Sequence, residues 1–198
     1  MEVKEYIEKK LRETKRAGIE DLIKFLEESD FFTAPASTRY HGAFPGGLAE
    51  HSLNVYDTMM AVDEMLYNKY GVPKAPQDSI IIVALLHDLT KVNQYATEQK
   101  WRKDANGKWE SYDAYVNKPD FTMGHSAKSI YLAQNYITLS PQEAQAIFWH
   151  MGAYDKSEYN NFNAMGEAFT NNQLAYKLHT ADMMATYILE NETIHWEN

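Results

Sequence analysis

The stretch Ile80-Ile81-Ile82-Val83-Ala84-Leu85-Leu86-His87-Asp88 decides how this chain folds. Its apolar run leaves no polar face, so a helix from about Gln77 to Leu89 must be surrounded by other elements. The run is also far shorter than the roughly 20 apolar residues of a membrane-spanning helix. It therefore predicts a central, buried helix that ends in His87 and Asp88.

Helical spacing of apolar residues recurs on both sides of this stretch. The segments Glu2–Arg16 and Ile19–Glu28 are rich in Glu, Lys and Leu and predict two N-terminal helices with solvated polar faces. A loop with Pro35, Pro45 and Gly46-Gly47 follows them and leads into a long helix from Leu48 to about Tyr70. His51 lies near the apolar stripe of that helix and is expected to point inward.

A hairpin interrupts the helical pattern between Gln94 and Asn117. The turn signal is Asp104-Ala105-Asn106-Gly107, and Trp101 and Trp109 flank it. The two tryptophans are more often a cross-strand packing contact than a stacking platform for a base.

The second half of the chain predicts more helices. After Gly124 the helical pattern resumes, and Ser140-Pro141-Gln142-Glu143 is a capping box that opens a helix carrying His150. A polar loop is expected from Gly152 to Asn172, in which Tyr154 is a candidate substrate contact. A last helix is expected from about Gln173 to Glu190, with this apolar stripe: Leu174, Leu178, Ala181, Ala185 and Leu189.

Length and composition limit the class of protein. The 198 residues, 44% of them hydrophobic, fit one domain, with an N-terminal helical extension over 1–35 and a core over 40–190. The fold class predicted is mostly α, a helical bundle with one small β-hairpin insertion. A net charge of −9 disfavours duplex DNA and long RNA as partners, and no segment predicts a membrane span, so we expect a cytoplasmic protein with a small substrate.

Histidine and carboxylate residues in apolar surroundings are the candidate functional set. Because the chain has no cysteine, His, Asp and Glu are its strong metal ligands. A single interior histidine is more often a hydrogen-bonded core residue than a ligand, but a set on several helices can converge inside a bundle. The candidate ligands are His51, His87, Asp88, His125, His150 and Asp182.

The order of these residues resembles the HD-domain superfamily of metal-dependent phosphohydrolases, over roughly Tyr40 to Leu189. The resemblance is carried by these segments: Phe44-Pro45-Gly46-Gly47-Leu48-Ala49-Glu50-His51-Ser52-Leu53, Ala84-Leu85-Leu86-His87-Asp88-Leu89-Thr90-Lys91, Gly124-His125-Ser126 and His179-Thr180-Ala181-Asp182. The first looks like a segment of bacterial members related to a 3′-to-5′ exoribonuclease. Thr90 departs from the pattern, since many relatives have Gly there.

The resemblance implies a dinuclear centre. His51, His87, Asp88 and Asp182 would hold one divalent metal, and His125 and His150 a second, with Asp88 bridging. The metals would be two of Mn, Fe, Ni, Co, Zn or Mg. Two such cations turn a bridging water into hydroxide near neutral pH and neutralise charge on a phosphoryl group under attack.

Three further residues are candidates for catalysis beside Asp88. Lys91 could hold a phosphate oxygen, or it could be a solvated cation at a helix end. Arg39 could bind phosphate and His41 could protonate a leaving group, although a surface arginine and a loop-bracing histidine are the simpler interpretations. His179 lies near Asp182 and is expected to support the site or to pack.

Three functions remain open from the sequence. The first is a metal-dependent phosphohydrolase that cleaves a phosphate ester of a nucleotide, cyclic nucleotide or short oligonucleotide. The second is a diiron oxygenase of the HD type, because iron accepts the same ligands. The third is a regulatory module that binds a nucleotide without turnover.

Overall fold

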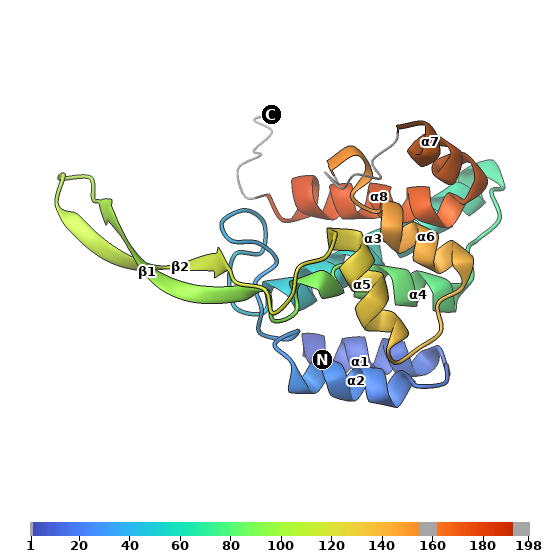
Figure 1. The fold of residues 1–198 in the computed structure, drawn as a ribbon. Helices are drawn as coiled ribbons and strands as arrows, with labels where there is room; N and C mark the ends of the chain where they lie inside the picture. Colours follow the sequence, from blue (N-terminus) through green and yellow to red (C-terminus); the bar gives the residue numbers. More distant parts are fainter. Residues whose placement is uncertain (1, 155–161, 192–198) are drawn as a thin grey trace.

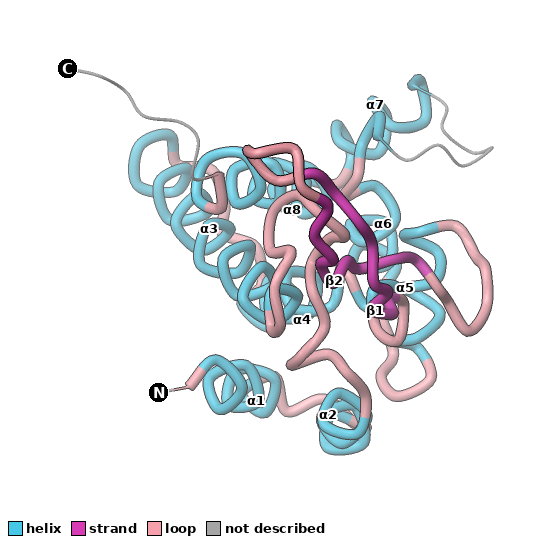
Figure 2. Tube along the Cα trace, turned by 90° about the vertical axis from the view of Figure 1, so that its left-hand side faces the viewer, coloured by secondary structure: helices cyan, strands magenta, loops and turns pink. Residues whose placement is uncertain are grey.

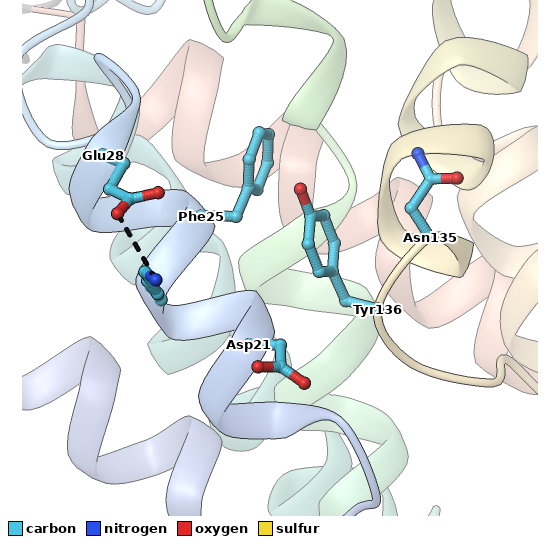
Figure 3. Close-up of a pocket in the computed structure, with 6 residues that line it drawn as sticks. Asp21, Phe25, Glu28, Asn135 and Tyr136 are labelled. Atoms are coloured by element: carbon cyan, nitrogen blue, oxygen red, sulfur yellow. Dashed lines mark ion pairs between the residues drawn. The ribbon is translucent and has the colours of Figure 1, made fainter.

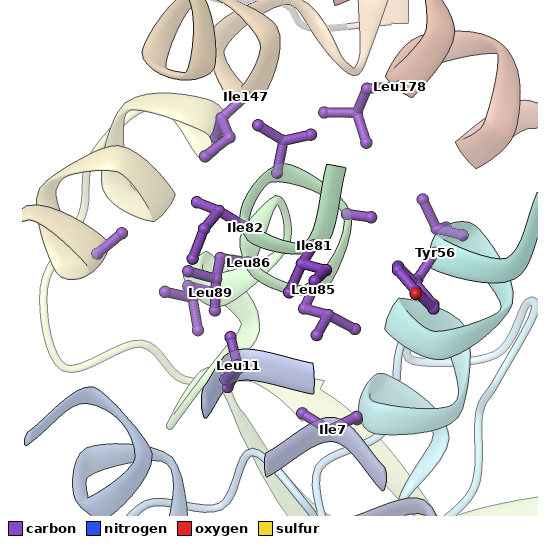
Figure 4. Packing of buried hydrophobic residues seen from close by; sticks show 14 of the residues in the cluster. Ile7, Leu11, Tyr56, Ile81, Ile82, Leu85, Leu86, Leu89, Ile147 and Leu178 are labelled. Atoms are coloured by element: carbon purple, nitrogen blue, oxygen red, sulfur yellow. The ribbon is translucent and has the colours of Figure 1, made fainter. Parts of the chain in front are cut away.

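Helix α4 (Gln77–Leu86) lies at the centre of the structure. The computed structural model describes residues 2–154 and 162–191, and within it every side chain from Ile80 to Leu86 is at most 2% exposed. Figure 4 shows Ile7, Tyr56, Ile147 and Leu178 arranged around this helix. The apolar run is buried on all sides because other helices cover each of its faces, as the sequence predicts.

The mostly α class with one β-hairpin is confirmed. Around α4 lie α1 (Val3–Glu13), α2 (Ile19–Glu28), α3 (Gly47–Tyr70), α5 (His125–Gln134), α6 (Pro141–Trp149), α7 (Phe162–Asn171) and α8 (Gln173–Met184). Helix α3 packs against α4 and α8, and α8 packs against α6. Figure 2 shows α1 and α2 side by side at one edge of the bundle. In the part of the chain that is described, none of the helices has both the length and the apolar character needed to cross a membrane.

The hairpin of β1 (Tyr95–Lys103) and β2 (Trp109–Asn117) extends away from the helices (Figure 1). The strands are antiparallel, and Trp101 faces Ser111 while Lys103 faces Trp109. The turn lies where the sequence predicts it, and Gly107 adopts the left-handed conformation, with φ +79°. Trp101 and Trp109 are not cross-strand partners, and both are mostly exposed, at 63% and 59%.

Two expectations about the helices are wrong. Helix α4 ends at Leu86 rather than Leu89, because Asp88 has φ −105° and ψ 21°, outside the helical region. A short 3₁₀ turn, Leu89–Lys91, follows it. The predicted loop from 152 to 172 contains α7 instead, and its Asn160 and Asn161 lie outside the described residues.

The last helix is close to its prediction but changes character at its end. Helix α8 runs to Met184 and continues as a π-helical turn, Ala185–Leu189, in which the Glu190 amide donates to the Ala185 carbonyl at 2.9 Å. The wider turn rotates the residues that follow. Leu189, expected on the buried stripe, is therefore 60% exposed, whereas Leu174, Leu178, Ala181 and Ala185 are buried.

The N-terminal helices join the bundle through stacked rings and an ion-pair network. Figure 3 shows Phe25 of α2 against Tyr136, with ring centroids 4.9 Å apart. Between α1 and α2, Arg16 pairs with Glu143 of α6 and donates to Asp78 of α4 at 2.8 Å. Glu143 is 1% exposed and also accepts a hydrogen bond from Ser79 at 2.6 Å. The capping box of α6 is therefore also its connection to α4 and to the N-terminal pair.

We expect Arg16→Ala to lower the free energy of unfolding by about 3 kcal/mol, because it leaves the Glu143 carboxylate buried without its cation. Burial acts to raise the pKa of Glu143, but hydrogen bonds from Arg16 and Ser79 lower it below its usual 4.5. The pair therefore stabilises the fold above about pH 4.5 and loses this effect as the pH falls.

Urea unfolding at about pH 7 and about pH 3 measures this effect. The difference between wild type and Arg16→Ala should shrink at the lower pH. Lys24→Ala is the control, since its ion pair with Glu28 is exposed and should contribute less than about 1 kcal/mol. An equal loss of stability at both pH values would contradict the assignment.

Candidate metal centre

The structure brings all of the predicted ligands together. Three of the side chains come from the ends of helices: His87 follows α4, His125 begins α5 and His150 follows α6. His51 lies in the first turns of α3, and Asp182 lies on α8. Apart from His125, whose side chain is 29% exposed, each member is at most 4% exposed as a residue.

Asp88 lies at the middle of this cluster. Its Oδ1 is 2.8 Å from His125 Nε2 and 3.6 Å from His150 Nε2. Its Oδ2 is 3.5 Å from His87 Nε2 and 3.6 Å from His51 Nε2. The two oxygens of one carboxylate thus face different histidine pairs, which is the arrangement that a bridging ligand requires.

The protein fixes which ring nitrogen of each buried histidine faces the centre. His87 Nδ1 donates to the Ala84 carbonyl at 2.8 Å, and His150 Nδ1 donates to the Ile147 carbonyl at 2.6 Å. Both acceptors are carbonyls of the last helical turn, where the regular hydrogen-bond pattern of the helix ends; the Ile147 carbonyl also accepts the His150 amide at 3.5 Å. With Nδ1 protonated, Nε2 of each neutral ring presents a lone pair to the centre.

The arrangement of these nitrogens fits a cation. His150 Nε2 is buried and has no hydrogen-bond partner, and His87 Nε2 is 3.4 Å from His51 Nε2. Two imidazole lone pairs at that distance repel unless a proton or a cation lies between them. Among the described residues, groups able to hold a metal ion include His51–His87–Asp88, His87–His150–Asp182 and Asp88–His125–His150.

Charges inside the cluster shift the pKa values in opposite directions. Burial lowers the pKa of His87 to about 4. Burial also acts to lower the pKa of His51, but hydrogen bonds to Asp182 and Glu190 outweigh it and raise the value to about 9. Against the effect of burial, Lys91 and His87 hold the pKa of Asp88 well below its usual value. The centre therefore holds ionised carboxylates together with a proton on His51.

Lys91 points into the centre. Its Nζ lies 2.6 Å from Asp88 Oδ2, and its side chain is 13% exposed. Thr90 does not divert it, because the Thr90 amide donates to Ser129 Oγ at 3.0 Å and so secures the 3₁₀ turn. Lys91 is thus a cation of the cluster and not a solvated helix end.

His41 lies at the edge of the centre, and Arg39 does not reach it. The His41 ring centroid is 4.9 Å from that of His51, and His41 Nε2 is buried without a hydrogen-bond partner. Burial, followed by the charges of His51 and Lys91, lowers the pKa of His41 to about 4. Arg39 is exposed, and its guanidinium contacts the ring and hydroxyl of Tyr40.

Glycines hold the loop that carries His41. A methyl group on Gly47 would lie 2.0 Å from the carbonyl oxygen of Gly42, so the backbones of these two residues approach as only glycine permits. The same carbonyl accepts the Ala36 amide at 2.8 Å, and Ser37 Oγ donates to the His41 carbonyl at 2.8 Å. The Gly46-Gly47 pair therefore positions His41 as well as starting α3.

Glu190 is part of the site and was not predicted from the sequence. Its carboxylate accepts from His51 Nδ1 at 3.0 Å and from Asn54 Nδ2 at 2.9 Å. In an unbroken α-helix, eight residues beyond Asp182 would place its side chain about 80° away from the face of Asp182. The π turn changes that rotation, and no sequence signal marked it.

The remaining candidates support the site or lie outside it. His179 Nδ1 donates to the His150 carbonyl at 2.6 Å, and its ring stacks on Phe169, so it packs and braces as expected. Tyr154 is exposed at 60% and is not among the residues of the cluster. The hairpin tryptophans are exposed to solvent. The surface hollow drawn in Figure 3, between α2 and Tyr136, is lined by none of the candidate metal ligands.

One of three comparisons with known proteins found a similar protein. The chain is 34% identical over 82 residues to dihydroneopterin 2′,3′-cyclic phosphate phosphodiesterase of Methanocaldococcus jannaschii. The match covers 41% of this chain and 30% of that protein. No protein-family model and no solved structure matches the chain. The chain is thus similar in part to a phosphodiesterase and holds buried His/Asp clusters able to bind metal ions.

Metal binding should release protons. Because the pKa of His51 is about 9, this ring is protonated near pH 7.5 and must lose a proton before Nε2 can bind a cation. We expect release of about one proton per chain, and an affinity that rises with pH up to about 9. Titration calorimetry with Mn²⁺, in two buffers of different ionisation enthalpy, counts the protons.

Glu190→Gln is the matched control for this experiment. It keeps the shape of the side chain but removes a carboxylate that raises the pKa of His51, so fewer protons should be released at the same pH. Mn²⁺ binding with the same heat in both buffers would mean that no net proton is released, which would contradict a protonated His51 in the metal-free protein.

Proposed function

We propose that this chain is a metal-dependent phosphohydrolase of the HD type that cleaves a phosphate ester. One observation carries the proposal: four histidine Nε2 atoms surround the two oxygens of Asp88, all within 3.6 Å of that carboxylate. The partial similarity to a phosphodiesterase supports hydrolysis as the reaction.

We assign the ligands as two groups that share Asp88. His51, His87 and Asp182 would hold one divalent cation with Asp88, while His125 and His150 would hold a second. Bound there, two cations would supply an activated water near neutral pH and would neutralise charge on the phosphoryl group. His87 and His150 suit this role because their Nδ1 protons are already bonded to backbone carbonyls.

Other residues would act on the substrate. Lys91 is close enough to Asp88 to contact a phosphate oxygen placed beside that carboxylate, and its charge would hold the oxygen in position. His41 would take up a proton once phosphate binds, because a nearby negative charge raises the pKa of an imidazole. It could then donate that proton to the leaving oxygen. Arg39 would meet only the outer part of a substrate.

The substrate class that we propose rests on the net charge of the chain and on the similar phosphodiesterase. A net charge of −9 favours a small molecule over a polyanion. The name of the relative specifies a 2′,3′-cyclic phosphate. We therefore propose a nucleotide, a cyclic nucleotide or a short oligonucleotide, with 2′,3′-cyclic phosphates as the first compounds to test. An oxygenase or a non-catalytic nucleotide-binding module is less supported, because neither accounts for the similarity to a phosphodiesterase.

The test is cleavage by protein reloaded with single metals. Metal-free protein would be supplied separately with Mn²⁺, Fe²⁺, Co²⁺, Ni²⁺, Zn²⁺ or Mg²⁺ and assayed on adenosine 2′,3′-cyclic phosphate, bis(p-nitrophenyl) phosphate and p-nitrophenyl phosphate. We expect hydrolysis of at least one diester, its loss with a chelator and its return with metal. Oxygen consumption without release of any phosphate product would favour the oxygenase.

Asp88→Ala should remove both metal binding and activity, since both groups of ligands depend on this carboxylate. The metal content, measured by elemental analysis, should fall from about two metals per chain in wild type to less than one in the variant. Asp57→Ala, an exposed aspartate on α3, is the control for the change of charge and should leave metal content and rate unchanged. Unchanged metal content in Asp88→Ala would refute the shared ligand.

A further inference from the structure

A hollow of about 760 Å³ opens beside the cluster, between the loop that carries His41 and the π turn at the end of α8. A smaller hollow of about 150 Å³ continues from it along α3 and is lined by His51. The two share Gly42, Phe44 and Glu190. Together they lead from the surface to the edge of the cluster, and the larger one has the size of a small-molecule site.

Aromatic side chains line the outer part of this space. Tyr40 is 70% exposed, Phe44 is 44% exposed and Tyr187 is 50% exposed, although all three border the same hollow. Exposed aromatic faces gathered around one concave surface favour a flat ring, because stacking removes apolar area on both partners from water. An aliphatic chain would gain the burial but not the stacking.

The inner part of the space is polar. His41 and Glu190 line it, and His41 Nε2 is buried without a hydrogen-bond partner. His41, His51 and Glu190 are close enough for one atom of each to lie within 4.8 Å of the others. A ligand that filled the hollow would therefore meet hydrogen-bonding groups between its outer ring and the metal centre.

We infer that this hollow binds the planar heteroaromatic ring of the substrate while its phosphate occupies the metal centre. The inference rests on the proposed function and adds the feature that the substrate must carry. The sugar or linker would pass His41 and Glu190, and the ring would stack among Tyr40, Phe44 and Tyr187. Ring binding away from the reacting bond would position the phosphate and select ring-bearing phosphates over bare ones.

Two substrates with the same reacting group test the inference. Adenosine 2′,3′-cyclic phosphate carries a heteroaromatic base, and 1-O-methylribose 2′,3′-cyclic phosphate does not. For the base-bearing substrate, Tyr187→Ala and Phe44→Ala should each raise KM about tenfold, since each removes an aromatic face on which the base would stack. The kinetics of the base-free substrate should stay unchanged in both variants.

Two controls separate stacking from structural damage. Tyr187→Phe keeps the ring and loses only the hydroxyl group, so it should retain the KM of wild type. Tyr67→Ala removes an equally exposed tyrosine, 16 residues or about 24 Å along α3 from His51, and should have no effect. A loss in Tyr187→Phe equal to that in Tyr187→Ala would overturn the stacking role.

The outcomes distinguish this inference from the proposed function. If wild type cleaves both cyclic phosphates with equal kcat/KM, or if the variants lose both activities alike, the ring site is wrong and the hydrolase stands. If no phosphate ester is cleaved with any metal, the proposed function fails. The ring site is then decided by binding of adenosine 2′-monophosphate, measured by calorimetry: about tenfold weaker binding in Tyr187→Ala supports it, and equal binding overturns it.

Discussion

The buried carboxylate of Asp88 is the constraint to which the rest of the structure responds. It is 3% exposed at the end of a helix whose side chains are almost all apolar, and an ion there costs several kcal/mol unless it is paired. Lys91 and four imidazoles from separate helices lie next to this carboxylate. Each of these partners must be held in place, and the packing of α3, α5, α6 and α8 in one bundle brings them to this charge.

Hydrogen bonds behind the cluster decide what that charge can bind. At the ends of α4 and α6 the same device recurs: a histidine at the helix cap donates Nδ1–H to the carbonyl three residues before it. This bond satisfies a helix-end carbonyl and turns the Nε2 lone pair inward. His51 differs, because Glu190 holds its Nδ1 and raises its pKa. His51 is therefore protonated near neutral pH, whereas His87 is neutral.

Much of this could be predicted from the sequence because it depends on local patterns. The apolar run predicted a central α4, the capping box predicted the start of α6, and Asp-Ala-Asn-Gly predicted the hairpin turn. The convergence of the six candidate ligands was also expected, and the structure places them together. Their roles as metal ligands stay a prediction.

The features that the sequence did not predict depend on the rotation of side chains along a helix and on contacts between distant segments. Glu190 reaches His51 because a π turn changes the rotation of α8, and the same turn exposes Leu189. Helix α7 was mistaken for a loop because it is short and begins in a stretch rich in asparagine, although half of its own residues are apolar. The close approach of Gly47 to Gly42 was also not predicted, because in the sequence both glycines looked like ordinary turn residues.

The candidate ligands and the walls of the neighbouring hollow lie on different kinds of structure. The candidate ligands sit on helices or helix caps that are packed into one core, so their mutual positions are fixed by buried side chains. The walls of the neighbouring hollow come from the 40–44 loop and from the end of α8, and their aromatic side chains Tyr40, Phe44 and Tyr187 are exposed. Substitutions in the walls can change which molecule is held without moving Asp88 or its partners. Glu190 touches both parts, since it accepts a hydrogen bond from His51 and lines the hollow, and it therefore connects the hollow to the protonation of His51.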